Sequence, residues 1–161
     1  MDVENQKTSY RRAGVKDVET LVECRVRFLN ELCDHPDDEN AESLKKTLRE
    51  YFSKAIPSGE FIAWLAEYEG KVVGTGGMVV WELPARYGGL ESGKAGYVLN
   101  MYTVPEARRK GVCTRLLNEL LEEARSMGLK YLHLHASEDG KSIYKKAGFV
   151  EPEQTELKLN M

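Results

Sequence analysis

The chain has 161 residues, of which 42% are hydrophobic and 30% are charged, and its formal net charge is −3. This composition is typical of one soluble globular domain over residues 1–161, and the negative charge argues against a nucleic-acid-binding module. No apolar run reaches membrane-spanning length and no signal-peptide pattern opens the sequence, so we expect a cytoplasmic protein without a membrane partner. Cys24, Cys33 and Cys113 form no CxxC or CxxH pair, so we expect reduced thiols and no metal site.

Two amphipathic helices and a pair of strands are predicted in the first half of the chain. Apolar residues recur at three- and four-residue steps in the helical segments, whereas strand-forming residues bounded by turn residues mark the strands. The elements expected in chain order are a short strand over residues 8–13, helices over 15–33 and 41–56, and strands over 60–69 and 70–83. Asn40 is the expected N-cap of the second helix, and Glu69-Gly70 marks the turn between the two strands.

The second half of the chain is predicted to alternate strands with helices. The elements expected after the glycine-rich loop are a strand over residues 95–104, a helix over 112–127, a strand over 129–136, a short helix over 139–147, and one or two strands within 149–161. The helix over 112–127 has a suitable length for the crossover of a parallel β-α-β unit. The whole order indicates a mixed α/β domain with its elements packed in layers.

Three consecutive basic residues, Arg108, Arg109 and Lys110, stand just before this crossover helix. The first turn of a helix carries the positive end of its macrodipole, so a basic cluster there costs stability unless an anion lies against it. Free backbone N–H groups, the cluster and Gly111, which permits close approach, together predict a phosphate site. The segment contains neither GxxxxGK[ST] nor GxGxxG, and a solvated basic turn stays open as the alternative.

The segment "LNMYTVPEARRKGVCTRLL" (residues 99–117) resembles the acetyl-coenzyme A motif of the GNAT superfamily of N-acetyltransferases. That motif is a strand, a V-x-P-type turn and [Q/R]-x-x-G-x-[G/A] at the start of a helix. The later "HASEDGKSIYKKAGF" resembles the second block of the family, in which Tyr144 is followed four residues on by Gly148. Two positions depart from the pattern: Cys113 replaces a usual Gly or Ala, and Ser137 replaces a frequent Asn.

The resemblance implies a GNAT-like fold and an acetyl-coenzyme A (acetyl-CoA) donor. The implied fold is a single mixed, largely antiparallel sheet with a central parallel β-α-β unit and helices on both faces. The backbone of residues 101–103 would pair with the pantetheine arm by β-augmentation, and the N–H groups of residues 109–114 would hold the pyrophosphate. The cofactor-binding residues implied are Met101, Tyr102, Thr103, Arg108, Arg109, Lys110, Gly111, Val112, Cys113, Thr114, Ser137 and Tyr144.

The chemistry implied is direct transfer of the acetyl group to a primary amine, without an acyl-enzyme. Tyr144 is the implied general acid for the leaving thiolate, and a backbone N–H near Met101 is the expected oxyanion donor. The base stays open: His135 is a candidate because of its pKa, and a half-buried strand histidine is the plain alternative. Glu82 is a weaker candidate. A helix N-terminus would lower the pKa of Cys113, although the motif favours a small packing residue there.

The acceptor is expected to bind between the first two helices and the loop over residues 82–94. These segments contain Arg25, Arg27, Arg86 and an acidic run over residues 34–39, which would attract a cationic amine or simply be solvated. We expect a small-molecule amine, with a peptide N-terminus or a lysine side chain as open alternatives. A homodimer also stays open, with residues 155–161 as a candidate edge strand. The rival function is a non-catalytic acyl-CoA-binding sensor on the same fold.

Overall fold

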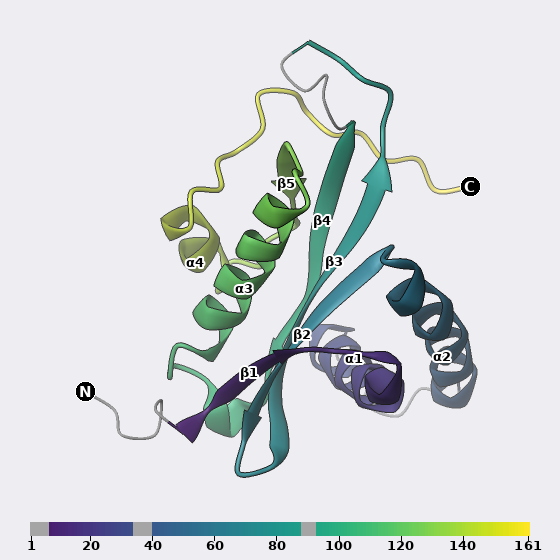
Figure 1. Ribbon diagram of the computed structural model, residues 1–161, viewed down its shortest axis with the longest axis vertical. Coiled ribbons are helices and arrows are strands. Elements are labelled where there is room, and N and C mark those ends of the chain that lie inside the picture. Colours follow the sequence, from purple (N-terminus) through teal and green to yellow (C-terminus); the bar gives the residue numbers. More distant parts are fainter. Residues whose placement is uncertain (1–6, 34–39, 88–92) are drawn as a thin grey trace.

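The computed structural model describes residues 7–33, 40–87 and 93–161, which form a five-stranded sheet covered by helices on both faces (Figure 1). The strands, in their order across the sheet, are β1 (Ser9–Arg12), β2 (Phe61–Tyr68), β3 (Lys71–Glu82), β4 (Lys94–Thr103) and β5 (Tyr131–His133). Neighbours from β1 to β4 are antiparallel, whereas β4 and β5 are parallel. The predicted fold class is therefore confirmed.

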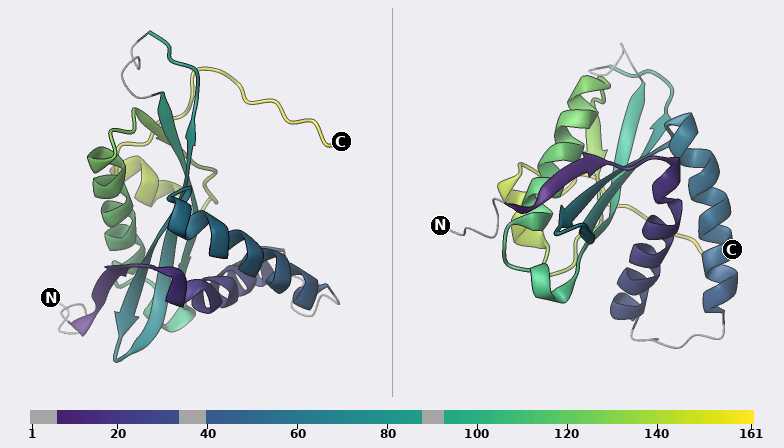
Figure 2. Two further views of the ribbon diagram at one scale, coloured as in Figure 1. Left: turned by 45° about the vertical axis from the view of Figure 1, so that its right-hand side comes forward. Right: turned by 60° about the horizontal axis from the view of Figure 1, so that its bottom comes forward.

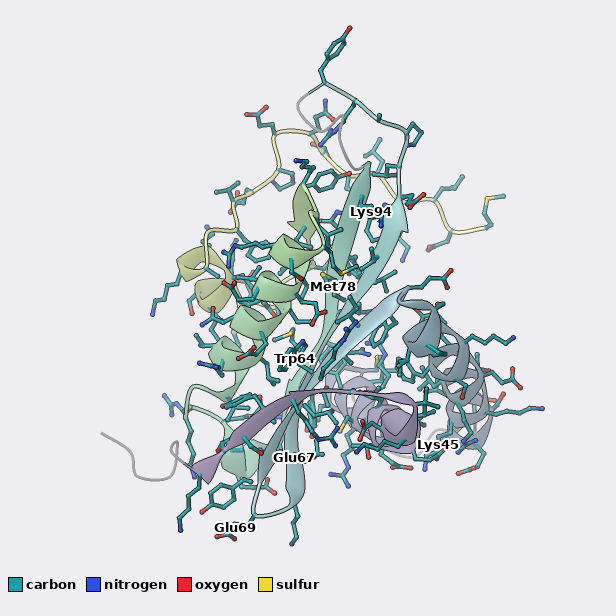
Figure 3. The ribbon with its side chains drawn as sticks, viewed as in Figure 1. Lys45, Trp64, Glu67, Glu69, Met78 and Lys94 are labelled. Atoms are coloured by element: carbon teal, nitrogen blue, oxygen red, sulfur yellow. The ribbon has the colours of Figure 1, made fainter. Side chains whose placement is uncertain are left out.

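The helices divide into two layers. Helices α1 (Val18–Cys33) and α2 (Ala41–Ser58) cover one face of the sheet, and α3 (Val112–Ser126) and α4 (Lys141–Lys146) cover the other (Figure 2). Neighbouring residues of β2 show why two cores form, because successive strand side chains point to opposite faces. Phe61 packs with Phe52 of α2, while Ile62 packs with Met78 and Leu117 on the α3 side. Figure 3 shows Met78 in the middle of the sheet.

Two predictions near the C-terminus are wrong. The strand expected over residues 129–136 is shorter than predicted. It is β5, which covers only Tyr131–His133 because its pairing with β4 ends at Tyr97 and His133. Residues 149–161 form no strand, including the candidate edge strand over 155–161. Their apolar residues Leu157 and Leu159 alternate with polar ones but are 90% and 81% exposed. Alternation indicates which residues would share a strand face, but a strand also needs a neighbouring edge to supply its hydrogen bonds.

A buried carboxylate fastens β1 to the start of α1. Asp17 is 5% exposed and accepts hydrogen bonds from the Nη1 and Nη2 atoms of Arg11 at 2.9 and 2.8 Å. It also accepts the backbone N–H of Gly14 at 2.8 Å. The hydrogen bonds from Arg11 outweigh the effect of burial, so the pKa of Asp17 lies below its usual value. The ion pair therefore stabilises the fold only while the carboxylate is charged.

We predict that Asp17→Asn lowers the free energy of unfolding at pH 7 by about 1–3 kcal/mol, because Arg11 keeps Glu67 but loses the more buried of its two carboxylate partners. The folded-state pKa is lowered, so the contribution is present above the unfolded pKa of about 3.9 and is lost as the pH falls through the folded value. Urea unfolding at pH 7 and pH 3 measures it. The difference between variant and wild type should shrink at pH 3, and an equal difference at both pH values would contradict the account.

Candidate active site

The site begins with a β-bulge in β4. The register between β3 and β4 shifts between Thr75 and Gly77, so Gly76 alone stands opposite Asn100 and Met101. Asn100 has a φ angle of 56°, in the left-handed region that asparagine tolerates better than most residues. The hydroxyl of Thr75, which is 2% exposed, donates to the backbone carbonyl of Asn100 at 3.0 Å. This hydrogen bond satisfies a carbonyl that the interrupted ladder leaves unpaired.

A gap opens between β4 and β5 just before the bulge. The parallel pairing joins residues 95–97 of β4 to residues 131–133 of β5 and ends there. In the described structure, none of residues 98–103 of β4 pairs with β5, whereas those on either side of the bulge pair with β3. Figure 1 shows β5 beside one end of β4 only. Backbone groups on such an open edge can pair with an extended ligand as though it were another strand.

The gap leads to the start of α3, which no side chain caps. Gly111 is the N-cap residue, with φ of 79°, and Arg109 also lies in the left-handed region, with φ of 62°. The first N–H groups of a helix have no intrahelical acceptor, so those of Val112 and Cys113 remain available to an anion. Gly74 lets this helix start approach the sheet, because a Cβ there would lie 2.9 Å from Cγ1 of Val112.

Arg108, the first residue of the basic cluster, is held by groups of the protein itself. Arg108 donates through Nε to the carbonyl of Thr103 at 2.9 Å, and its guanidinium pairs with Glu31 of α1. Tyr102 also donates to Glu31, at 2.9 Å. Burial alone would raise the pKa of Glu31, but the hydrogen bonds from Arg108 and Tyr102 lower it. Arg108 thus ties the end of β4 to α1, a role that the sequence did not predict.

Tyr144 packs on the α3 side of the sheet. It belongs to the same apolar cluster as Leu117 and makes a T-shaped contact with Phe149, with ring centroids 6.1 Å apart. Burial raises the pKa of Tyr144 to about 12, and nearby Cys113 contributes to the increase. Tyr144 therefore lies close to the start of α3 and is protonated at neutral pH. Burial also raises the pKa of Cys113, which disfavours the thiolate and agrees with a small packing residue at this position.

Ser137 and His135 lie in the segment between β5 and α4. The Ser137 hydroxyl accepts the N–H of Gly140 at 3.2 Å, at the start of α4. Nδ1 of His135 lies 2.6 Å from the hydroxyl of Tyr97, and its Nε2 lies 3.3 Å from the carboxylate of Glu156. His135 is exposed, but Tyr97 connects it to the point where β4 and β5 separate.

Two residues without a role predicted from the sequence, Asn100 and His133, lie on the α1 side of the gap with Arg25, one of the candidate acceptor residues. Asn100 accepts a hydrogen bond from Nη1 of Arg25 at 2.6 Å. His133 lies against the rings of Trp81 and Tyr97, each with a centroid separation of 5.1 Å, and burial lowers its pKa. An asparagine within an apolar strand segment is unusual, and this was the signal that could have identified the bulge.

Other candidate acceptor residues lie apart from this gap. Arg86 stacks on the Tyr131 ring at 4.8 Å, beside a hollow of about 240 Å³ at the end of the sheet. Arg27 is exposed on α1, and Glu82 is exposed at the end of β3, 4.0 Å from Lys94. The acidic run over residues 34–39 lies outside the described residues. Within the described ranges, no group of three or more His, Cys, Asp or Glu side chains is arranged to hold a metal ion.

Comparison with known proteins identifies the family. The chain matches the acetyltransferase (GNAT) family over residues 26–149, which include both sequence motifs. The chain belongs to this family. Its structure superposes, with a TM-score of 0.83, on the crystal structure with acetyl-CoA of a predicted acetyltransferase from Clostridium acetobutylicum. The two chains are 31% identical, and the match covers 95% of this chain and 96% of that one.

One further solved structure shares the fold, and one curated relative matches part of the sequence. A GCN5-related N-acetyltransferase from Ralstonia eutropha JMP134 shares the fold, with a TM-score of 0.80 and 23% identity over 94% of this chain and 98% of that one. An uncharacterized N-acetyltransferase of Escherichia coli (strain K12), YjgM, is 35% identical over 89 residues. That match covers 53% of this chain, and the chain spans about half of YjgM, 49% of its length.

The predictions of a GNAT acetyltransferase and of acetyl-CoA as its donor are confirmed. The residues present fit this donor, because one gap offers an unpaired strand edge for amides and an uncapped helix start for phosphates. The roles of individual site residues stay predictions. Among the described helices, none has both the length and the apolar character needed to cross a membrane.

We predict that Thr75→Val lowers the free energy of unfolding by about 1–3 kcal/mol and raises the Kd for acetyl-CoA about tenfold, because the Asn100 carbonyl loses its donor and the bulge shifts. Urea unfolding and titration calorimetry measure the two effects. Thr103→Val is the matched control for the unfolding measurement, since the buried Thr103 hydroxyl has no hydrogen-bond partner in the described structure. An equal loss of unfolding free energy in both variants, or an unchanged Kd for acetyl-CoA in Thr75→Val, would show that the Thr75 hydroxyl does not hold the bulge.

Proposed function

We propose that this protein transfers the acetyl group of acetyl-CoA directly to the primary amine of a small molecule. The observation that carries the proposal is the gap between β4 and β5, which opens beside the bulge and ends at the uncapped start of α3. A small acceptor is favoured because the polar groups beside the bulge are recessed, with Asn100 only 7% exposed. The net charge of −3 also gives no support for a large anionic partner.

Backbone groups would hold the donor. Acetyl-CoA supplies an acyl group activated as a thioester. Met101, Tyr102 and Thr103 would pair with its pantetheine amides, because these residues form the open edge of β4. The N–H groups of residues 109–114 would bind the pyrophosphate, with salt-sensitive attraction from Arg109 and Lys110. An N–H near Met101, at the bulge, would donate to the acetyl carbonyl oxygen as negative charge develops there.

Tyr144 would act as the general acid. Its pKa of about 12 keeps the phenol protonated at neutral pH, so a proton is available to donate to the leaving sulfur. Tyr144 belongs to the core on the α3 side, whereas Arg25 of α1 reaches the bulge from the opposite layer. The acid and the acceptor amine would therefore approach the thioester from different sides, and the acid would not obstruct the amine.

His135 would remove the proton of the ammonium group. The Tyr97 hydroxyl, 2.6 Å from Nδ1 of His135, offers a hydrogen-bonded route from the mouth of the gap to an exposed imidazole. A histidine is suited to this role because it changes charge near neutral pH. The neighbouring His133 is held among aromatic rings, where burial favours its neutral form.

We predict that Tyr144→Phe lowers kcat about 10²- to 10³-fold while the Kd for acetyl-CoA changes less than about threefold, because the variant loses a proton donor and little packing. Steady-state kinetics with an amine panel measures kcat, and titration calorimetry with acetyl-CoA, CoA, ATP and NAD measures binding. Tyr51→Phe on α2 is the matched control. Unchanged turnover would remove Tyr144 from the mechanism, and CoA binding without any turnover in wild type would favour the sensor.

A further inference from the structure

Arg25 brings a positive charge to the acceptor side of the gap. Its Nη1 donates to Oδ1 of Asn100 at 2.6 Å, and its guanidinium carbon lies 5.6 Å from the ring centroid of Phe28. The side chain is half-buried between α1 and β4, and burial lowers its pKa. Because a guanidinium stays charged near neutral pH, this position holds a cation that has lost part of its hydration.

No carboxylate of the described chain neutralises Arg25. Its contacts there are a neutral amide and an aromatic ring, whereas most other arginines have an acidic partner within 4.0 Å. The arginines with such a partner are Arg11, Arg12, Arg49, Arg108, Arg115 and Arg125. A partly buried charge without a counterion is costly, and a guanidinium has five N–H donors, in a geometry that matches a carboxylate.

The position of Arg25 connects this charge to the reaction. Its partner Asn100 is the bulge residue, next to the backbone N–H near Met101 that would face the acetyl carbonyl. Asn100 and Met101 are adjacent, with Cα atoms about 3.8 Å apart, so the guanidinium is separated from the expected oxyanion donor by little more than one side chain, which a small amino acid can span. The Tyr97 phenol lies close enough to Arg25 to offset part of the lowering of its pKa by burial, so the amine and the carboxylate of the acceptor would enter the gap at the same end.

We infer that Arg25 binds a carboxylate of the acceptor, so that the substrate is a small amine of the amino acid class. The inference rests on the proposed function, because it names the acceptor of that reaction. Carboxylate binding would neutralise the guanidinium and place the amine toward the gap. The same charge would disfavour polyamines and other polycationic amines, since like charges repel at close range.

The first test compares Arg25→Gln with wild type on matched acceptors. Glutamine keeps an N–H donor for Asn100 but removes the charge, and Arg27→Gln on the exposed side of α1 is the matched control. The probes are glycine, β-alanine, 4-aminobutanoate and L-phenylalanine, each with its carboxamide, together with spermidine. Acetylation is followed by the release of CoA thiol at several concentrations of each acceptor.

For at least one of these pairs, wild type should show a kcat/KM at least about tenfold higher for the acid than for its amide. Arg25→Gln should raise KM for that acid about 10- to 100-fold and change the values for the amide less than about threefold. Equal use of acids and amides by wild type, or a preference for spermidine, would overturn the inference. Equal losses for acid and amide in Arg25→Gln, with weaker acetyl-CoA binding, would show that Arg25 only holds the bulge.

A binding measurement separates this inference from the proposed function. CoA-loaded protein is titrated with N-acetylglycine, N-acetyl-L-phenylalanine and their carboxamides, which requires no turnover. Binding of an acid that Arg25→Gln weakens at least about tenfold supports the carboxylate site, even if no amine is acetylated and the proposed function fails. Acetylation of amines without any preference for the carboxylate form, in turnover or in binding, overturns the inference and leaves the proposed function standing.

Discussion

The bulge at Asn100 and Met101 is the constraint on which the rest of the site depends. A regular β4 would continue its ladder, and β5 could follow it along its whole length. The extra residue bends β4, so β5 separates after His133 and leaves a strand edge open. Two features of β3 permit this bend: the Thr75 hydroxyl satisfies the Asn100 carbonyl, and Gly76 leaves room for Met101, whose sulfur would lie 2.9 Å from a Cβ.

The two helical layers give the gap two chemically different sides. The side facing α3 and α4 offers the uncapped helix start and Tyr144, a phenol kept neutral by its raised pKa. The side facing α1 offers Arg25, a cation without a carboxylate partner among the described residues, and an aromatic group that includes Tyr97 and His133. A donor with phosphates suits the first side, and an acceptor with a carboxylate suits the second. The sheet lies between the groups suited to the donor and the groups suited to the acceptor, and they meet only where β4 and β5 separate.

Local features of the sequence were predictable, and features set by distant contacts were not. The helices follow from apolar spacing, and α3, α4 and their motifs lie where the sequence placed them. The length of β5 and the absence of a strand in residues 149–161 depend on which edges meet, and periodicity does not contain that information. The bulge depends on the register between β3 and β4, which leaves only Asn100 as a signal.

The pKa of Cys113 and the contacts of Arg108 also depend on parts of the chain that are distant in sequence. Position at a helix start predicted a lowered pKa for Cys113, but burial, which depends on the packed fold, raises it. Arg108 was assigned to phosphate from its place in the motif, whereas Glu31, 77 positions away along the chain, takes its guanidinium. In the sequence, Arg25 is one of several charged residues in the segments expected to bind the acceptor. The structure shows that it contacts the bulge.

The most direct test of this account is a two-dimensional ¹⁵N–¹H NMR titration of the labelled protein with acetyl-CoA. The account predicts the largest amide shifts at residues 101–103 on the open edge of β4 and at residues 109–114 around the start of α3. Amides of β1 and α2, which lie away from the gap, should change little. Saturable binding with its largest shifts outside these two segments, or no binding at all, would contradict the claim that the gap holds the donor.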